Sequence, residues 1–345
     1  MKDFIKYNIK QIMCHVLYHA GYFDRQLGKI KDRAVILMFH SIKENGCRIG
    51  VNKESFEKQM EYIKEKMNPV PLITIAHWIS KGKSIPPRAV AVSFDDGYED
   101  NFIMAYPILK KFSIPATIFL TTGHIESTKI FWWDKVSEII KKTNKSCINL
   151  KDFQNFRNGS ANSPELLKLN TFSRKVDAIF TIIKFFKTFE YNRIDEAIDL
   201  LEKKMDVDDK DIEVSPMLNW RQIKEMKKDG IDFGAHTVTH PDLTKIAQDE
   251  AVKEIKSSKD TIEQKIDATI YGFAYPYGLK DHFNEKITKI IKNAGFHYTC
   301  SAEPGIVTKG NDAYDLKRIS MNSNSLPLAV WKIYKSIKYS TDEKG

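Results

Sequence analysis

The run of residues 89–94, Ala-Val-Ala-Val-Ser-Phe, is apolar and leads directly into Asp95, Asp96 and Gly97. An apolar run rich in β-branched residues that stops at a turn residue is typical of a buried parallel strand. Folds built from such strands place their chemistry at the carboxyl ends. Two adjacent ionised carboxylates repel each other, so a fold tolerates them where a cation or a shared proton neutralises the pair. The pattern predicts a functional site at Asp95 and Asp96, with a helix cap beside a solvated aspartate as the alternative.

Other predicted strands also end in polar side chains. Residues 34–39 lead into His40, and residues 231–235 lead into His236 and His240. Two histidines four residues apart can hold one ion if the backbone turns between them, because neutral imidazole is a common zinc ligand. An isolated histidine such as His40 is more often structural than catalytic, and the four-residue spacing of two histidines also occurs by chance. The recurrence of such patterns at several strand ends favours one shared site.

Short strands that alternate with helices predict an α/β fold with a parallel sheet. We expect about eight strands, and therefore a distorted or incomplete (β/α) barrel. Tyr275 and Arg318 lie within two of these strands. A helix over residues 55–66 is expected to begin with Ser55 as its cap. The expected strands cover residues 34–39, 70–75, 89–94, 115–120, 231–235, 270–275, 296–300 and 316–320.

Three segments depart from this alternation. Residues 1–33 are expected to form an amphipathic helical segment, residues 34–322 the barrel domain, and residues 323–345 a C-terminal helix or tail. Inside the barrel domain, residues from about 127 to 216 are expected to form a helical insertion. This insertion carries Trp132 and Trp133, whose rings suit packing, partner contact or stacking on a sugar ring.

The composition narrows the classes of partner. With 345 residues, of which 42% are hydrophobic, the chain can bury a large core, and no apolar run approaches the ~18 residues of a membrane span. The net charge of +9 comes from lysines scattered along the chain, which argues against nucleic-acid binding. The cysteines form no C-x-x-C pair and are expected to be reduced and mostly buried: Cys14, Cys47, Cys147 and Cys300.

The first thirty residues carry apolar side chains at helical spacing, including Ile5, Ile9 and Ile12, with lysines between them. We expect a helix that packs against the domain; the alternative is a basic amphipathic helix that lies on a lipid surface. The start of the chain shows neither the continuous apolar core nor the cleavage site of a secretory signal. The expected location is cytoplasmic, with peripheral contact at the inner membrane face if the helix binds lipid.

Three motifs resemble, in their order, those of the polysaccharide deacetylases. This is the NodB-homology group (carbohydrate esterase family 4) of metal-dependent enzymes with a distorted (β/α) barrel. The motifs are Ser-Phe-Asp-Asp-Gly at 93–97, His-Thr-Val-Thr-His-Pro at 236–241 and Phe-Ala-Tyr-Pro-Tyr-Gly at 273–278, with Asn-Trp at 219–220 before the second. The resemblance covers the regions around 34–125 and 216–322 and excludes the insertion and the first thirty residues.

The resemblance implies that Asp95 is the catalytic base and that Asp96, His236 and His240 bind a divalent metal. The expected metal is Zn²⁺, with Co²⁺, Ni²⁺ or Mn²⁺ as alternatives. One carboxylate and two imidazoles leave coordination positions open for water and for a substrate carbonyl, which is what a hydrolytic metal site needs.

Two features of many family members are missing here. Those members carry an arginine in the third motif, where this chain has Ala274, and a histidine in a C-terminal motif that this chain does not have. The subgroup that deacetylates poly-N-acetylglucosamine shares the Tyr-Pro-Tyr-Gly form and carries its acid histidine near the N-terminus, which implies His40 as the general acid. Arg318 is the candidate partner of Asp95, unless it pairs locally with Asp315.

Together these inferences predict a metal-dependent hydrolase of carbon–nitrogen bonds, a carbohydrate N-deacetylase. It would remove N-acetyl, or O-acetyl, groups from a bacterial surface glycan or its lipid-linked precursor. Tyr275, Pro276 and Tyr277 are expected to contact the substrate, with a backbone N–H near Tyr277 at the oxyanion. The alternative is a non-catalytic glycan-binding protein on a decayed esterase fold. The sugar, the linkage and the oligomeric state stay open.

Overall fold

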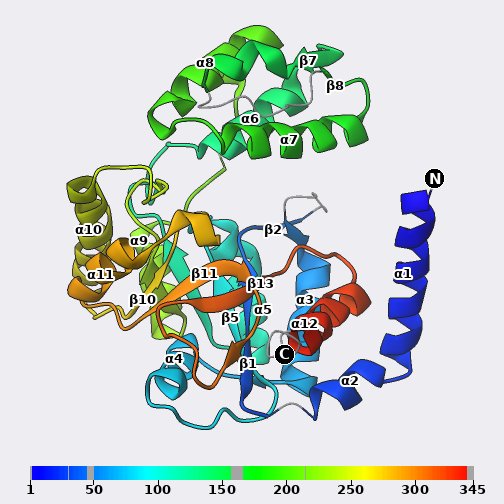
Figure 1. The fold of residues 1–345 in the computed structure, drawn as a ribbon, viewed down its shortest axis with the longest axis vertical. Helices are drawn as coiled ribbons and strands as arrows, with labels where there is room; N and C mark the ends of the chain where they lie inside the picture. Colours follow the sequence, from blue (N-terminus) through cyan, green and yellow to red (C-terminus); the bar gives the residue numbers. More distant parts are fainter. Residues whose placement is uncertain (1, 30, 45–49, 157–165, 214, 340–345) are drawn as a thin grey trace. The chain divides into compact units, whose positions relative to one another are not determined.

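The computed structural model describes residues 2–29, 31–44, 50–156, 166–213 and 215–339. The chain divides into two compact units. The barrel unit contains residues 1–126 and 217–345, and the inserted unit contains residues 127–216. Figure 1 shows the elements of both units, coloured along the sequence.

The barrel unit is built around a closed ring of seven parallel strands. Each strand pairs with the next in the order β1, β13, β11, β10, β9, β6, β5, and β5 closes the ring on β1. The predicted (β/α) barrel is therefore confirmed, with seven strands in the ring where about eight strands were expected. The ring strands are β1 (Arg33–Phe39), β5 (Ala89–Phe94), β6 (Ala116–Leu120), β9 (Asp232–Ala235), β10 (Gly272–Ala274), β11 (Tyr298–Pro304) and β13 (Leu316–Ser320).

The described part of this unit contains four shorter strands as well. β4 (Asn68–Pro69) pairs with β5 in parallel, and β12 (Val307–Thr308) pairs with β1 antiparallel. β2 (Ile42–Lys43) and β3 (Val51–Asn52) form a small parallel sheet of their own. The connection between β11 and β13, all of it described, contains β12 and no helix.

Helices surround most of the ring, which explains why every residue of β5 and β6 is buried. Strands covered on both faces form continuous apolar runs instead of alternating ones. The helices of this unit are α1 (Lys2–His19), α2 (Tyr22–Leu27), α3 (Lys53–Lys66), α4 (Leu72–Ser80), the π-helix η1 (Asn101–Ala105), α5 (Tyr106–Phe112), α9 (Trp220–Lys228), α10 (Gln248–Ile266), the short η5 (Lys280–His282), α11 (Glu285–Asn293) and α12 (Leu326–Tyr339).

The N-terminal helix α1 packs beside α12, and the two are drawn in blue and red in Figure 1. Cys14 is fully buried on its inner side, while the apolar side chains of Ile12 and Val16 are 65% and 62% exposed. The expected packing helix is therefore present, and part of its outer face is apolar. Among the described residues, no helix combines the length and the hydropathy that crossing a membrane requires.

The strand predicted over residues 70–75 is wrong. Most of this segment belongs to α4, whose buried side chains are Leu72, Ile75, Ala76 and Ile79. This spacing has the period of a helix. The window of residues 70–75 is too short to show that period, and its β-branched isoleucine and threonine residues favour a strand. The strand that does form here is the two-residue β4.

One smaller expectation also fails, the cap at Ser55, while the described cysteines are mostly buried as expected. The cap of α3 is Asn52, whose side-chain oxygen accepts a hydrogen bond from the backbone N–H of Ser55 at 2.7 Å. Cys147 is exposed, whereas Cys14 and Cys300 are buried as expected. Cys47 lies outside the described residues.

The inserted unit has a core of its own, formed by helices and a small antiparallel hairpin. The hairpin, β7 (Cys147–Asn149) with β8 (Leu166–Lys168), was not expected from the sequence, because two three-residue strands carry no readable pattern. Trp132 packs on Phe186, and Trp133 stacks on Phe131 with ring centroids 4.5 Å apart. The helices are α6 (Trp132–Lys142), α7 (Phe172–Phe186) and α8 (Ile194–Met205), with short 3₁₀ turns η2 (Leu150–Phe156), η3 (Tyr191–Arg193) and η4 (Asp209–Asp211).

Candidate active site

The side chains predicted for the site meet at the carboxyl ends of the ring strands. Asp95 and Asp96 follow β5, His236 follows β9, and His240 lies four residues further on. Asp96 and His240 both have left-handed backbone conformations, with φ of 77° and 63°. Non-glycine residues adopt this conformation at a cost, and such strain concentrates at functional sites. The turns at these two residues aim their side chains at one point.

Three donor atoms of different residues converge there. The Oδ1 atom of Asp96 lies 3.6 Å from Nε2 of His236 and 3.7 Å from Nε2 of His240. All three residues are buried, and their candidate ligand atoms lie within 4.8 Å of one another. The sequence prediction that Asp96, His236 and His240 lie together is thus matched by their geometry.

His236 is held in one orientation and one charge state. Its Nδ1 atom lies 2.7 Å from the carbonyl oxygen of Ala274. A carbonyl oxygen only accepts hydrogen bonds, so Nδ1 carries the proton. Nε2 is then unprotonated, and its lone pair is directed at the point where the three donor atoms converge. Burial lowers the pKa of His236 to about 4, against the opposing effect of the nearby Asp95 carboxylate. The imidazole is therefore neutral at physiological pH, as a metal ligand must be.

These donors fit a divalent metal. Two ligands that bind a tetrahedral zinc ion at 2.0–2.1 Å lie about 3.4 Å from each other, close to the 3.6 and 3.7 Å found here. The Ala274 carbonyl supplies the outer hydrogen bond that orients a ligating histidine. One carboxylate and two imidazoles suit zinc and also the neighbouring transition metals.

The loop between the two histidines is clamped by two side chains. The hydroxyl of Thr237 donates to the His236 carbonyl at 2.5 Å and accepts the backbone N–H of His240 at 3.0 Å. On α10, the Glu254 carboxylate accepts the backbone N–H groups of Val238 and Thr239 at 2.7 and 2.9 Å. It also accepts the Thr239 hydroxyl at 2.8 Å. These bonds hold the turn that brings the two imidazoles together.

Beside the metal-type donors lies a buried ion pair. Both oxygens of the Asp95 carboxylate accept hydrogen bonds from the two terminal nitrogens of Arg318, each at 2.7 Å. Nε of Arg318 donates to the Ser301 carbonyl at 2.8 Å, and a terminal nitrogen donates to the Ser93 hydroxyl at 3.3 Å. Arg318 thus pairs with Asp95, and the two residues form no ion pair with Asp315 in the described structure.

This pair keeps Asp95 charged. Burial by itself raises the pKa of the Asp95 carboxyl, but the Arg318 guanidinium, with smaller contributions from His236 and His40, lowers it below its ordinary value overall. Because both carboxylate oxygens are held by one planar guanidinium, the group is also fixed in orientation. Asp95 is therefore an oriented, ionised carboxylate next to the candidate metal ligand Asp96.

His40 and the third motif lie at the same end of the barrel. His40 follows β1, is exposed, and acts electrostatically on both Asp95 and His236. Its backbone carbonyl accepts a hydrogen bond from Asn101 at 2.8 Å. In the third motif, the ring of Tyr277 contacts that of His240 edge-on, with centroids 4.9 Å apart.

The other members of the third motif are less accessible. Tyr275 and Pro276 are buried, and burial raises the pKa of the Tyr275 hydroxyl to about 12. This hydroxyl donates to the Tyr314 carbonyl at 3.2 Å. The structure therefore places Tyr277 at the donor cluster, while the Tyr275 side chain supports the wall behind it.

Sequence reasoning missed the residues that hold the site from outside it. Ser93 stands inside the first motif and Thr237 inside the second, so their positions were a usable signal. Glu254 is 14 residues after His240 on an ordinary amphipathic helix, and nothing local marks it. Its contact with the loop arises only when α10 packs beside β9.

Comparison with known proteins adds independent observations. A family model described as polysaccharide deacetylase matches residues 82–148 and 184–299, more than half of the chain. A poly-beta-1,6-N-acetyl-D-glucosamine N-deacetylase of Staphylococcus aureus is 24% identical over an alignment of 302 residues, which covers 84% of this chain and 73% of that protein.

Two solved structures share the fold. One is the Streptococcus pyogenes deacetylase PplD in complex with acetate, with 22% identity, a TM-score of 0.56, and coverage of 89% of this chain and 99% of that one. The other is IcaB from Ammonifex degensii, with 17% identity, a TM-score of 0.57, and coverage of 89% and 97%.

Proposed function

The chain belongs to the polysaccharide deacetylase family, and from this membership we propose that it removes N-acetyl groups from a poly-N-acetylglucosamine glycan in a metal-dependent reaction. The family predicted from the three motifs is confirmed, as is the enzyme class, a carbohydrate deacetylase that hydrolyses carbon–nitrogen bonds. The name of the S. aureus relative supports the more specific glycan. The single observation that supports metal dependence is the convergence of Asp96, His236 and His240.

The residues of the site have different proposed roles in amide hydrolysis, metal binding and proton transfer. Asp96, His236 and His240 would hold the divalent cation. When bound, this cation would supply Lewis-acid chemistry that polarises a carbonyl and makes a water molecule easier to deprotonate. Asp95, kept ionised and oriented by Arg318, accepts the proton of the attacking water.

The remaining steps, cleavage of the amide bond and protonation of the leaving nitrogen, involve residues at the carboxyl ends of the barrel strands. The water oxygen bonds to the acetyl carbon, the carbon–nitrogen bond breaks, and His40 gives a proton to the departing nitrogen. The products are acetate and a free sugar amine. Tyr277 lies beside His240, where its backbone N–H is proposed to stabilise the negative oxygen of the transition state.

Release of acetate from β-1,6-linked N-acetylglucosamine oligomers tests the proposal. We expect the full chain to release acetate and free amine in equal amounts, to lose this activity with a chelator, and to recover it with Zn²⁺. Unchanged hydrolysis after complete removal of divalent ions would reject the metal. Hydrolysis of acetyl esters but not of the oligomers would reject the N-acetylated glycan.

The proposed place of work is the inner face of the cytoplasmic membrane, on a lipid-linked precursor of the glycan. It is supported by α1, whose exposed apolar side chains Ile12, Met13 and Val16 lie on the same helix as Lys2, Lys6 and Lys10. Burial of apolar side chains and about 1 kcal/mol per basic residue from anionic lipid would act together and weaken as salt rises.

Co-sedimentation with anionic vesicles tests this location. We expect Ile12→Glu to reduce binding of the full chain, while the same change at Ile103, an exposed isoleucine outside α1, leaves binding unchanged. Equal binding by both variants, or no binding by the unmodified chain, would reject the role of α1.

A further inference from the structure

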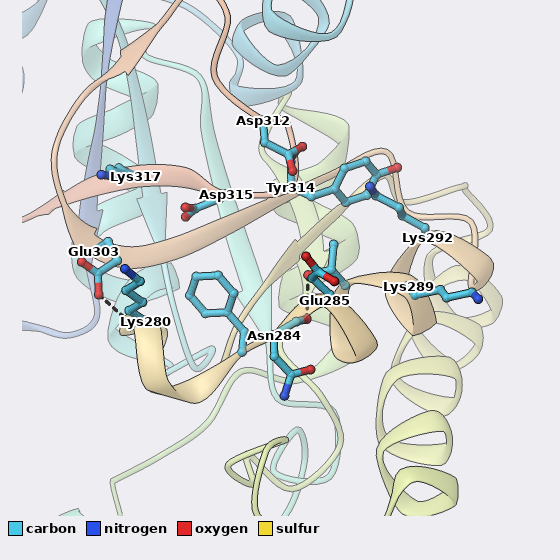
Figure 2. A pocket seen from close by; sticks show the side chains of 12 residues that line it. Lys280, Asn284, Glu285, Lys289, Lys292, Glu303, Asp312, Tyr314, Asp315 and Lys317 are labelled. Carbon is cyan, nitrogen blue, oxygen red and sulfur yellow. Dashed lines mark hydrogen bonds between the residues drawn. The ribbon is translucent and has the colours of Figure 1, made fainter. Parts of the chain in front are cut away.

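A cavity of about 800 Å³ lies outside the barrel, along β11, β13 and α11. Figure 2 shows Lys280 and Glu303 at one end of it and Tyr314 and Lys292 at the other. It is open because the connection between β11 and β13 contains no helix, so this part of the ring lacks the cover that other strands have. Its volume is within the range of small-ligand sites.

The cavity is joined to the third motif by aromatic stacking. Phe283, which lines the cavity, stacks on Tyr275 with ring centroids 4.3 Å apart and an angle of 11° between the planes. Lys280 lines the cavity two residues after Gly278, the last residue of the motif. The segment from Tyr275 to Asn284 therefore borders the candidate active site at one end and this cavity at the other.

Charges of both signs line the cavity in equal number. The lysines are Lys280, Lys289, Lys292 and Lys317, and the carboxylates are Glu285, Glu303, Asp312 and Asp315. Within the described structure, none of these eight side chains forms an ion pair. With a net charge of zero, the lining attracts neither polyanions nor polycations as a class. It can still pair individual groups of a polar ligand.

Asp315 indicates which group is bound. Its Oδ1 atom is buried and has no hydrogen-bond partner among the described residues, although the side chain lies in the wall of the cavity. Leaving a buried carboxylate oxygen without a donor is costly. The Asp315 carboxylate as a whole is half-buried and lines the cavity. A protonated amine on a ligand can therefore approach it from the cavity and offset its negative charge, whereas an acetylated sugar offers no charge. The half-buried ring of Phe283 adds a flat apolar face, to which a cation is also attracted.

We propose that this cavity is an accessory site for glycan that carries free amino groups, which Asp315 binds as ammonium. The inference rests on the proposed function, because deacetylation is the reaction that produces such amines. The cavity would hold parts of the glycan that have already been deacetylated. Acetylated sugar units of the same glycan would meanwhile reach the active site across the segment from Tyr275 to Asn284.

Calorimetric titration of the full chain with a glucosamine tetramer tests the accessory site. We expect Asp315→Asn to weaken binding about tenfold or more, since the variant loses the charge of a charge-assisted hydrogen bond. Asp281→Asn is the matched control, because Asp281 is an aspartate close to the cavity, on the segment from Tyr275 to Asn284, but does not line it. The acetylated tetramer is expected to bind equally to the unmodified chain and to Asp315→Asn.

The two proposals fail separately. Acetate release from a short acetylated oligomer is expected to be the same in Asp315→Asn and in the unmodified chain, since Asp315 is outside the catalytic machinery. Binding of the glucosamine tetramer that is insensitive to Asp315→Asn, or equally reduced by Asp281→Asn, would overturn the accessory site even in an active enzyme. Loss of deacetylation with Asp315-dependent binding intact would overturn only the proposed reaction.

Discussion

Arg318 and Lys317 are neighbours on β13, yet the positive charge of Arg318 is buried and paired, whereas that of Lys317 lies on the outside of the barrel. Arg318 points into the barrel, is fully buried, and has Asp95, Ser93 and Ser301 as partners. Lys317 points outward by the alternation of a strand and lines the open cavity, and it forms no ion pair with any described residue. A charge inside the barrel must be paired because water cannot solvate it, whereas a charge on the outside is available to a ligand.

The same contrast holds for the carboxylates of the two regions. Asp95 is buried and accepts two hydrogen bonds from one guanidinium. Asp315 is only half-buried, and one of its oxygens has no donor among the residues that the structure describes. We infer that the inner charges are organised for one reaction, and that the outer ones serve recognition. The following variants test that division.

Asp95→Asn tests the reactive side of the comparison and should have the largest effect. We expect turnover to fall by about 10²–10⁴, because general-base catalysis contributes on that scale. Metal affinity, measured by titration of the metal-free protein, should stay unchanged because Asp96 carries the ligand. Loss of the metal in this variant would mean that the roles of the two aspartates are divided wrongly.

The pair Arg318→Met and Lys317→Met compares the two faces of one strand directly. Removing Arg318 leaves Asp95 buried and unpaired, so we expect a loss of about 3–5 kcal/mol in the free energy of unfolding. Removing Lys317 should change it by less than about 0.5 kcal/mol, as is usual for a surface position. Urea denaturation measures both, and equal losses would contradict the contrast.

The loss in Arg318→Met should also depend on pH. Although burial raises the pKa of Asp95, its partners lower it overall below the ordinary value of about 3.9. The stabilisation by the ion pair is therefore complete above about pH 4 and is lost as the pH falls through the folded-state pKa. The difference between the unmodified chain and the variant should shrink in that acidic range, and a difference that grows there would contradict the assignment.

His40→Ala tests a residue at the rim, between the buried and the exposed regions. As a general acid, His40 should account for ~10²-fold in turnover, with metal affinity nearly unchanged. Acetate release and metal titration measure the two quantities. A variant within a few-fold of the unmodified enzyme would remove His40 from the reaction.

Glu254→Gln tests whether a carboxylate outside the barrel affects metal binding at the candidate active site. Its three hydrogen bonds hold the loop between the histidines, so we expect metal affinity to fall by about 10–100-fold, as for other outer partners of metal ligands. Asp260→Asn, an exposed carboxylate on the same helix, is the control. Unchanged metal affinity in Glu254→Gln, measured on the full chain by titration, would limit this residue to a structural role.

Much of the site was predictable because its residues follow directly after strands. Asp96, His236 and His240 come next to β5 and β9 in the sequence, and parallel strands bring their carboxyl ends to one edge. The prediction failed where the signal was short or distant. The sequence predicts a strand over residues 70–75, although α4 begins at Leu72, and nothing near Glu254 in the sequence indicates its contact with the loop.

The sequence by itself determined the family, the barrel and the set of chemically active residue types, because these depend on local patterns and on the order of the motifs. Only the tertiary structure decided that Arg318 pairs with Asp95 and not with its neighbour Asp315. Arg318 reaches Asp95 because β13 and β5 both pair with β1 in the closed ring, a relation between residues far apart in the chain. The open cavity beside β13 was decided in the same way. The cavity depends on the lack of a helix between β11 and β13 and on the positions of the eight charged side chains that line it. No short segment of the sequence predicts either feature.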